Sequence, residues 1–212
     1  MANSLNWDFY RPQIQNLAKL NFNYDEKVYQ TSEDKKGWKI DRYQALLAIE
    51  PPGPPLINGA FKAVQNSLRL YQFPDPRLIS AIFDPDRELY GRDMLMLAKF
   101  AGFTFTFGVR ITAVIDEVRT DSSKQKIQVW GYSYRTLTGH FEIGEIRFEV
   151  FKNLKSGEVF FEINAYSKPD RIPNFFNRTG FRLFGRSLQK YFATSSIDRL
   201  QKLAQKSLSQ KI

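Results

Sequence analysis

The 212-residue sequence contains no cysteine and a single histidine, His140. The absence of cysteine excludes a disulfide scaffold, a thiolate zinc site, an iron–sulfur cluster and a cysteine nucleophile. One histidine is too few for a catalytic scheme that needs two imidazoles, and it removes most of the remaining metal sites. We therefore expect neither a metal nor a cofactor, and the lack of thiols favours a reducing compartment.

Long hydrophobic runs and targeting signals are also absent. The longest apolar stretch, 94–115, is interrupted by Lys99 and Arg110 and alternates phenylalanine with threonine, which predicts strands and not a spanning helix. The first 13 residues contain neither the basic nor the apolar region of a secretory signal. We expect a cytoplasmic protein. Its contents of 42% hydrophobic and 25% charged residues are typical of one globular domain.

Positive charge is concentrated at the C-terminal end of the chain. The net charge is +9, and residues 169–212 contain nine Lys or Arg against two Asp or Glu. A basic stripe recurs there at steps of four: Arg178, Arg182, Arg186 and Lys190. This stripe could contact an anionic membrane surface or an acidic partner, or it could be an ordinary solvated helix face. Nucleic acid is not favoured, because the sequence contains no zinc finger, ribonucleoprotein motif or basic glycine-rich loop.

The first part of the chain predicts an extension, a strand and a helix. Residues 1–36 are polar with scattered aromatics, and we expect them to pack as an extension on a single domain at 37–212. A strand is predicted from Trp38 to Glu50, where a PPGPP segment ends it. A helix should follow, with Asn58 as its N-cap. Its apolar face comprises Phe61, Val64, Leu68 and Tyr71.

The centre of the chain alternates apolar and polar residues with a period of two, which is typical of strands. One predicted apolar face comprises Phe103, Phe105, Phe107, Val109, Ile111, Ala113 and Ile115. The next predicted strand carries Trp130, Tyr132 and Tyr134 on one face. Two further strands are expected near 140–151 and 158–167. Together these segments predict an antiparallel meander of four strands.

The last segment changes to a helical period. From about Asn174 to Ser209 the pattern predicts one long amphipathic helix. Its apolar side comprises Phe181, Phe184, Leu188, Tyr191 and Phe192. A curved antiparallel sheet that holds a long helix across its concave face would bury both apolar surfaces. We therefore predict an α+β chain with the helix-grip fold.

Three stretches resemble a known family: 134–148, 165–169 and 188–202 resemble uncharacterised protein family 0548. The first keeps most of that family's motif: Tyr134, Leu137, Gly139, His140, Glu142, Gly144 and Glu145. It departs from the motif at Arg135, Thr138 and Ile146. The resemblance implies no activity, because the family has none established. It does imply the START-like, birch-pollen-allergen-like helix-grip superfamily, whose members often enclose an apolar cavity for lipids, hormones or polyketides.

His140 and Glu142 are the strongest candidates for chemistry. They share the parity of Ile146 and Phe148 and should point at the core or a cavity, roughly 7 Å apart along one face. Such a pair could orient a ligand or transfer a proton. Alternatively, Gly144 could mark a bulge that turns both side chains to solvent, or the pair could only stabilise the hairpin.

Other side chains could line the same cavity: Trp130, Tyr132, Tyr134, Phe184, Leu188 and Tyr191. Ordinary core packing is the alternative for each of them. Three functions remain open at this point. The first is a binding module for an apolar or amphipathic small molecule, the second an enzyme that uses His140 and Glu142, and the third a peripheral membrane or protein-partner module that uses the basic stripe.

Overall fold

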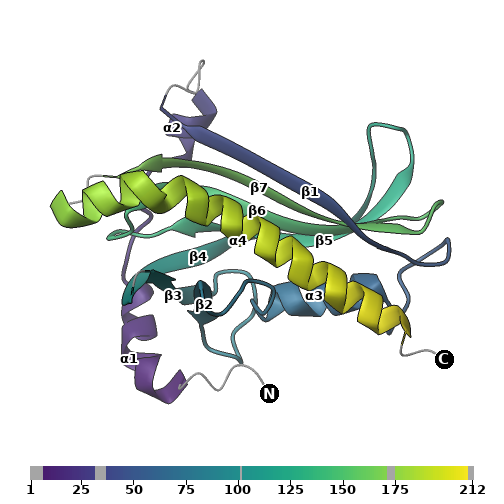
Figure 1. Cartoon of the computed structure of the whole chain (residues 1–212), viewed down its shortest axis with the longest axis horizontal. Coiled ribbons are helices and arrows are strands. Elements are labelled where there is room, and N and C mark those ends of the chain that lie inside the picture. Colours follow the sequence, from purple (N-terminus) through teal and green to yellow (C-terminus); the bar gives the residue numbers. More distant parts are fainter. Residues whose placement is uncertain (1–6, 32–36, 101, 171–174, 210–212) are drawn as a thin grey trace.

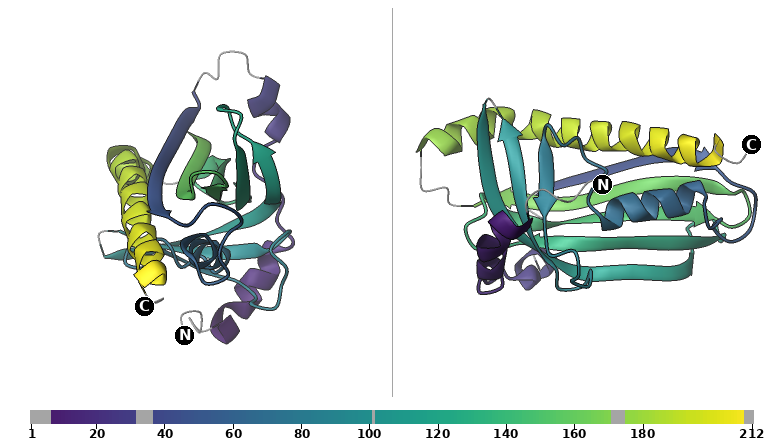
Figure 2. Two further views of the ribbon diagram at one scale, coloured as in Figure 1. Left: turned by 90° about the vertical axis from the view of Figure 1, so that its right-hand side faces the viewer. Right: turned by 90° about the horizontal axis from the view of Figure 1, so that it is seen from below.

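In the part of the chain that the structure describes, seven antiparallel strands form one curved sheet that holds a long helix (Figures 1 and 2). The computed structural model describes residues 7–31, 37–100, 102–170 and 175–209, with the backbone alone for Val28, Thr31, Phe100 and 175–186. The strands are β1 (Lys39–Ile49), β2 (Ile79–Ile82), β3 (Asp93–Phe100), β4 (Phe103–Thr120), β5 (Lys126–Thr136), β6 (Glu142–Asn153) and β7 (Glu158–Pro169). Their order across the sheet is β1-β7-β6-β5-β4-β3-β2.

Four helices in the described part complete the fold: α1 (Trp7–Leu17), α2 (Glu26–Thr31), α3 (Ala60–Arg69) and α4 (Phe175–Ser209). Helix α3 lies on the concave side of the sheet, and α4 runs past it along β1 (Figure 2). Helix α1 packs on β3 and β2. The predicted meander and terminal helix are confirmed, and so is the helix-grip fold. No helix among the described residues is long and apolar enough to cross a membrane.

The main core lies between the concave face of the sheet and the helices α3 and α4. Its residues include Phe61, Leu68, Phe73, Tyr132, Phe148, Val150, Phe161 and Leu200. Helix α4 approaches this core with small side chains, since Ala193, Ser196 and Ala204 are each at most 1% exposed. A smaller apolar cluster lies under α1, where Ile14 and Leu17 pack with residues of β2 and β3.

The N-terminus of α3 is capped by the side chain of Glu50, which directly follows β1. The predicted cap at Asn58 is wrong, because the N-cap is Gly59, which has no side chain to donate or accept. Instead, Glu50 Oε1 accepts the Phe61 N–H at 2.9 Å. Glu50 Oε2 in turn accepts from Lys152 Nζ at 2.8 Å, and both side chains are 0% exposed. A buried ion pair therefore joins β1, β6 and the first turn of α3.

The predicted apolar face of β4 is wrong at both of its ends. At its start, Phe103 is 68% and Phe105 37% exposed. There β4 pairs with β3 alone, because its register with β5 begins only at Val109. Further along, the register with β5 shifts between Ile111 and Ala113. The shift is a bulge that turns the later residues to the opposite face, so the single-parity pattern does not hold along the strand.

Candidate ligand site

The concave face changes from fully packed to partly exposed along its length. In its packed half, Tyr132, Phe148 and Phe161 are at most 1% exposed. Two residues further along each of the same strands, most of the inward-facing side chains are partly exposed. We call this region the open half: it comprises the partly exposed Lys39, Asp41, Tyr134 and Ile146 and the buried Glu142. Because α3 fills only one end of the concave face, the other end is less completely packed (Figure 2).

Glu142 lies at the start of β6 and faces α4. It is 9% exposed, and Gln189 Nε2 of α4 donates to its Oε1 at 3.2 Å. Burial raises the pKa of Glu142, while the positive charge of Lys39 and the Gln189 hydrogen bond oppose that shift. The Glu142 carboxyl has a raised pKa and a polar partner on α4. It can accept a hydrogen bond when ionised, and it can also donate one when protonated.

Gln189 has an unused acceptor at the same place. Its Oε1 atom is buried and has no hydrogen-bond partner among the described residues. A buried amide oxygen without a partner costs free energy, so such atoms are uncommon in folded proteins. A donor group that entered the open half would remove this cost.

His140 lies two residues before Glu142 and holds the local chain in a turn. Its Nδ1 accepts the Glu142 backbone N–H at 2.9 Å, which assigns the proton of the neutral ring to Nε2. Burial lowers the pKa of His140 to about 3. The ring packs edge-on against Phe107, with centroids 4.5 Å apart. His140 is therefore neutral near pH 7 and behaves as part of the apolar lining.

The strand that carries Glu142 is regular, so the bulge alternative at Gly144 is wrong. The pairs between β6 and β7 run without a shift from Glu142 to Lys152. Gly144 serves instead as a point of close approach. A Cβ atom there would lie 2.1 Å from the Tyr166 carbonyl oxygen, so no other residue fits without displacing backbone.

Of the three aromatic residues predicted on β5, only Tyr134 lies in the open half. Trp130 and Tyr132 are 6% and 1% exposed and pack in the core, where the Tyr132 hydroxyl donates to the Leu68 carbonyl at 3.1 Å. The Tyr134 hydroxyl lies 3.5 Å from that of Tyr71. Burial raises the pKa of Tyr134 to about 12, so its hydroxyl stays protonated and can donate to a bound group.

The predicted residues of α4 are placed only in part. Leu188 is partly buried, and Lys190 is exposed. Tyr191 is 47% exposed and faces the loop after α3, not the open half. The side chains of Phe184, Arg178, Arg182 and Arg186 lie outside the described residues. Among the described residues, no group of three or more His, Asp or Glu side chains could hold a metal ion.

Comparisons with known proteins place the chain in a family. A family model described as "Domain of unknown function (DUF1990)" matches residues 23–199. The chain belongs to the DUF1990 family. The name of family 0548, suggested by the resemblance, stays a prediction. A search of curated protein sequences finds no match.

Solved structures place this DUF1990 member among helix-grip proteins. A norcoclaurine synthase point mutant from Thalictrum flavum, in complex with a transition state analogue, aligns with a TM-score of 0.50 at 8% identity, over 82% of this chain and 97% of that one. Ara h 8.0201 aligns with a TM-score of 0.42 at 13% identity, over 82% and 99%. Protein CV1439 from Chromobacterium violaceum gives 0.44 at 15%, over 78% and 96%. These likenesses concern the fold alone.

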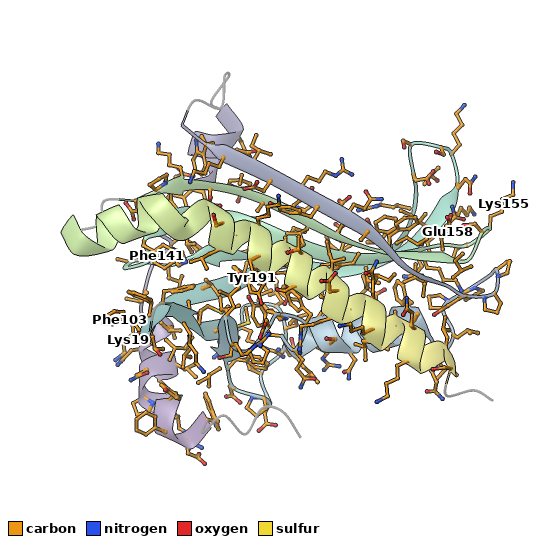
Figure 3. All side chains as sticks on the ribbon, viewed as in Figure 1. Lys19, Phe103, Phe141, Lys155, Glu158 and Tyr191 are labelled. Atoms are coloured by element: carbon orange, nitrogen blue, oxygen red, sulfur yellow. The ribbon has the colours of Figure 1, made fainter. Side chains whose placement is uncertain are left out.

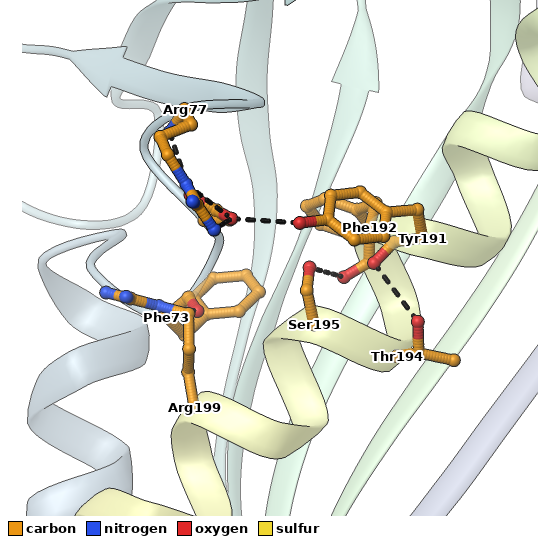
Figure 4. A network of polar contacts seen from close by, with 8 residues as sticks. Phe73, Arg77, Tyr191, Phe192, Thr194, Ser195 and Arg199 are labelled. Atoms are coloured by element: carbon orange, nitrogen blue, oxygen red, sulfur yellow. Dashed lines mark hydrogen bonds and ion pairs between the residues drawn. The ribbon is translucent and has the colours of Figure 1, made fainter.

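A groove of this DUF1990 chain lies on its outside, between α4 and the loop at 74–77. This groove of about 450 Å³ includes Asp75, Arg77, Tyr191 and Arg199. Asp75 and Arg77 form an ion pair within the groove (Figure 4): Asp75 Oδ2 accepts from Arg77 at 2.8 Å and also from Tyr191 at 3.1 Å. Arg199 donates to the carbonyls of Phe73 and Gln72. The contacts attach α4 to the loop and have a structural role.

Sequence reasoning missed Gln189, Lys39 and Asp41. The signal for Gln189 was its spacing of four, seven, eleven and fifteen residues before Ala193, Ser196, Leu200 and Ala204, which form the inward stripe of α4. A polar residue on that stripe must lie under the helix. Lys39 and Asp41 alternate with Ile40 and Arg42 on β1, and their parity matches that of the inward-facing Tyr43.

Proposed function

We propose that this chain is a binding module that holds an amphipathic small molecule between the open half of the sheet and α4. The proposal rests chiefly on one observation: the buried Glu142 carboxyl meets Gln189 across the grip, and Gln189 Oε1 has no partner in the described part. The polar end of the guest donates a hydrogen bond to Gln189 Oε1 and exchanges one with Glu142.

The apolar part of the guest lies against side chains that are only partly covered. These are Phe107, Tyr134 and Ile146, and the buried neutral ring of His140 packs against Phe107. Contact with a guest would remove this apolar surface from water at roughly 25 cal/mol per Å². The open half combines these apolar side chains with the polar Lys39, Asp41 and Glu142, and small-molecule sites likewise use a small number of polar groups to orient a guest. The Thalictrum flavum synthase, with its bound transition state analogue, supports the view that this fold can accommodate a small molecule.

Proton transfer by His140 is not favoured. A general acid or base works best with a pKa near the working pH, and burial lowers the pKa of His140 to about 3. Its Nδ1 is also engaged by the Glu142 N–H. We therefore propose binding without assigning a reaction, and the basic-stripe function stays a prediction because most of that stripe lies outside the described residues.

The proposal can be tested with a variant that fills the open half. Ile146→Trp adds an indole where the proposed guest lies, whereas Ile57→Trp adds the same group at a surface position that is 88% exposed. Gently purified wild-type protein should show a bound organic compound by native mass spectrometry. The Ile57→Trp variant should keep that compound, and the Ile146→Trp variant should lose it while retaining a cooperative thermal transition.

A dye assay provides a second measurement. Anilinonaphthalene sulfonate should bind wild-type protein and the Ile57→Trp variant with equal affinity and bind the Ile146→Trp variant at least about tenfold more weakly. If wild-type protein is empty and the dye binds all three proteins equally, the open half does not hold a guest.

A further inference from the structure

The hairpin of β3 and β4 exposes aromatic side chains at its tip. Phe103 is 68% and Phe105 37% exposed, and their ring centroids lie 6.5 Å apart. This part of β4 pairs only with β3, and β2 pairs with β3 as far as Ala98, opposite Phe105, so only the last residues of the tip extend beyond β2. Neighbouring exposed aromatics on a projecting element are typical of an interaction surface.

The hairpin segment 94–109 that forms this tip contains positive charge and no carboxylate. Between Met94 and Val109 the one charged residue is Lys99, and Lys19 is exposed where α1 ends. Figure 3 shows Lys19 and Phe103 at the same end of the molecule. Phenylalanine beside lysine suits a membrane interface, because the rings enter the acyl boundary while the ammonium groups contact anionic headgroups.

The tip is continuous with the open half. Phe103, Phe105 and Phe107 share one face of β4, and Phe107 contacts the rings of His140 and Phe141 at centroid distances of 4.5 and 4.9 Å. Figure 3 shows Phe103 and Phe141 at this same end. A row of aromatic side chains therefore runs from the exposed tip to the edge of the open half.

We infer that the tip formed by Lys99, Phe103 and Phe105, with Lys19 beside it, docks on an anionic membrane surface. In this orientation the open half faces the bilayer, and an amphipathic molecule can pass between the bilayer and the grip along the row of phenylalanines. Two exposed phenylalanines at the end of one hairpin offer little of the roughly 800 Å² per partner that a stable protein interface needs, but they suit insertion among lipid headgroups. The docking itself does not depend on the proposed small-molecule function.

Vesicle co-sedimentation tests the inference with a matched control on the same strand. The tip variant is Phe103→Ser with Phe105→Ser, and the control is Val114→Ser with Val118→Ser, whose side chains are 41% and 54% exposed further along β4. Wild type and control should bind phosphatidylcholine vesicles that contain roughly one-third phosphatidylserine, and bind less at high salt. The tip variant should bind at least about tenfold more weakly.

The absence of cysteine permits a direct probe of the docked surface. A single cysteine placed by Phe103→Cys or Val118→Cys can be labelled uniquely with an environment-sensitive fluorophore. The label at 103 should shift to the blue on adding the anionic vesicles, and the label at 118 should not. Equal vesicle binding by the tip variant and wild type would overturn the inference, as would binding that is lost only in Lys190→Glu. Wild type that ignores vesicles but self-associates through the tip would also overturn it.

Discussion

Acidification should destabilise the protein through its one histidine, His140, over the range in which histidine normally titrates. The ordinary pKa of histidine is 6.5, and burial lowers that of His140 to about 3. As the pH falls below about 6.5, the unfolded chain binds a proton at His140 that the folded chain does not bind. The stability associated with the neutral ring is therefore complete above about pH 6.5 and is lost progressively as the pH falls towards about 3.

The size of this loss follows from the separation of the two pKa values. One pKa unit corresponds to about 1.4 kcal/mol, so the loss should reach about 2 kcal/mol at about pH 5 and about 5 kcal/mol at most. Glu142 acts in the opposite direction. Burial raises its pKa, so its protonated form favours the folded state as the pH falls. The pH dependence of wild-type stability therefore contains both contributions.

The variant His140→Asn separates the two contributions. Asparagine can accept the Glu142 N–H with its Oδ1, as His140 does with Nδ1, and it does not titrate. Urea unfolding of both proteins between about pH 7.5 and about pH 5 should show wild type losing about 2 kcal/mol relative to the variant. Because the chain has one histidine, its ring resonance in wild-type protein is unambiguous and should not titrate over this range. Parallel stability curves, or a folded-state pKa near 6.5, would refute the reasoning.

Three further substitutions test how the grip is held together, each by urea unfolding at neutral pH. Lys152→Met leaves Glu50 buried without its cation and should lower the free energy of unfolding by about 3–5 kcal/mol. Adding Glu50→Gln to the same chain should restore most of this stability. A double variant that is no more stable than Lys152→Met would contradict the ion-pair account. Gly144→Ala should lower the free energy of unfolding by more than about 2 kcal/mol. Gly139→Ala should lower it by less, because its added Cβ meets no atom within 4 Å and only the φ of +93° is unfavourable. Ser196→Ala should be neutral or stabilise by up to about 1 kcal/mol, because its buried Oγ has no partner in the described part; a clear loss would reveal an unrecognised bond.

The sheet and the long helix could be predicted because their signals are local. Alternation with a period of two marks β5, β6 and β7, whose inward residues are buried by the same core along most of each strand. Helix α4 likewise contains no proline, and its inward residues Ala193, Ser196, Leu200 and Ala204 follow a helical spacing. Local patterns of this kind determine the class of each element and, through burial of apolar faces, the layer architecture.

The details that failed depend on contacts between distant residues. Asn58 has the residue type of an N-cap, but the Glu50 carboxylate, held by Lys152 on another strand, already accepts the Phe61 N–H. The exposure of Phe103 depends on where β5 ends, which the sequence of β4 does not contain. Tyr191 satisfies the apolar period of α4, yet it projects sideways to Asp75 because the helix rests on the core through smaller residues.

The division of the concave face follows from the position of one short helix. Helix α3 lies between sheet and α4 at one end, where Phe61 and Leu68 bring the core to complete burial, and Glu50 holds the start of the helix there. The open half at the other end has no such filler in the described part. It carries a carboxyl with a raised pKa and an amide oxygen without a partner, which a purely structural interior would have replaced with apolar side chains. Helix α3 thus stabilises the grip at one end, and at the other end the proposed guest would supply the hydrogen bond that Gln189 Oε1 lacks.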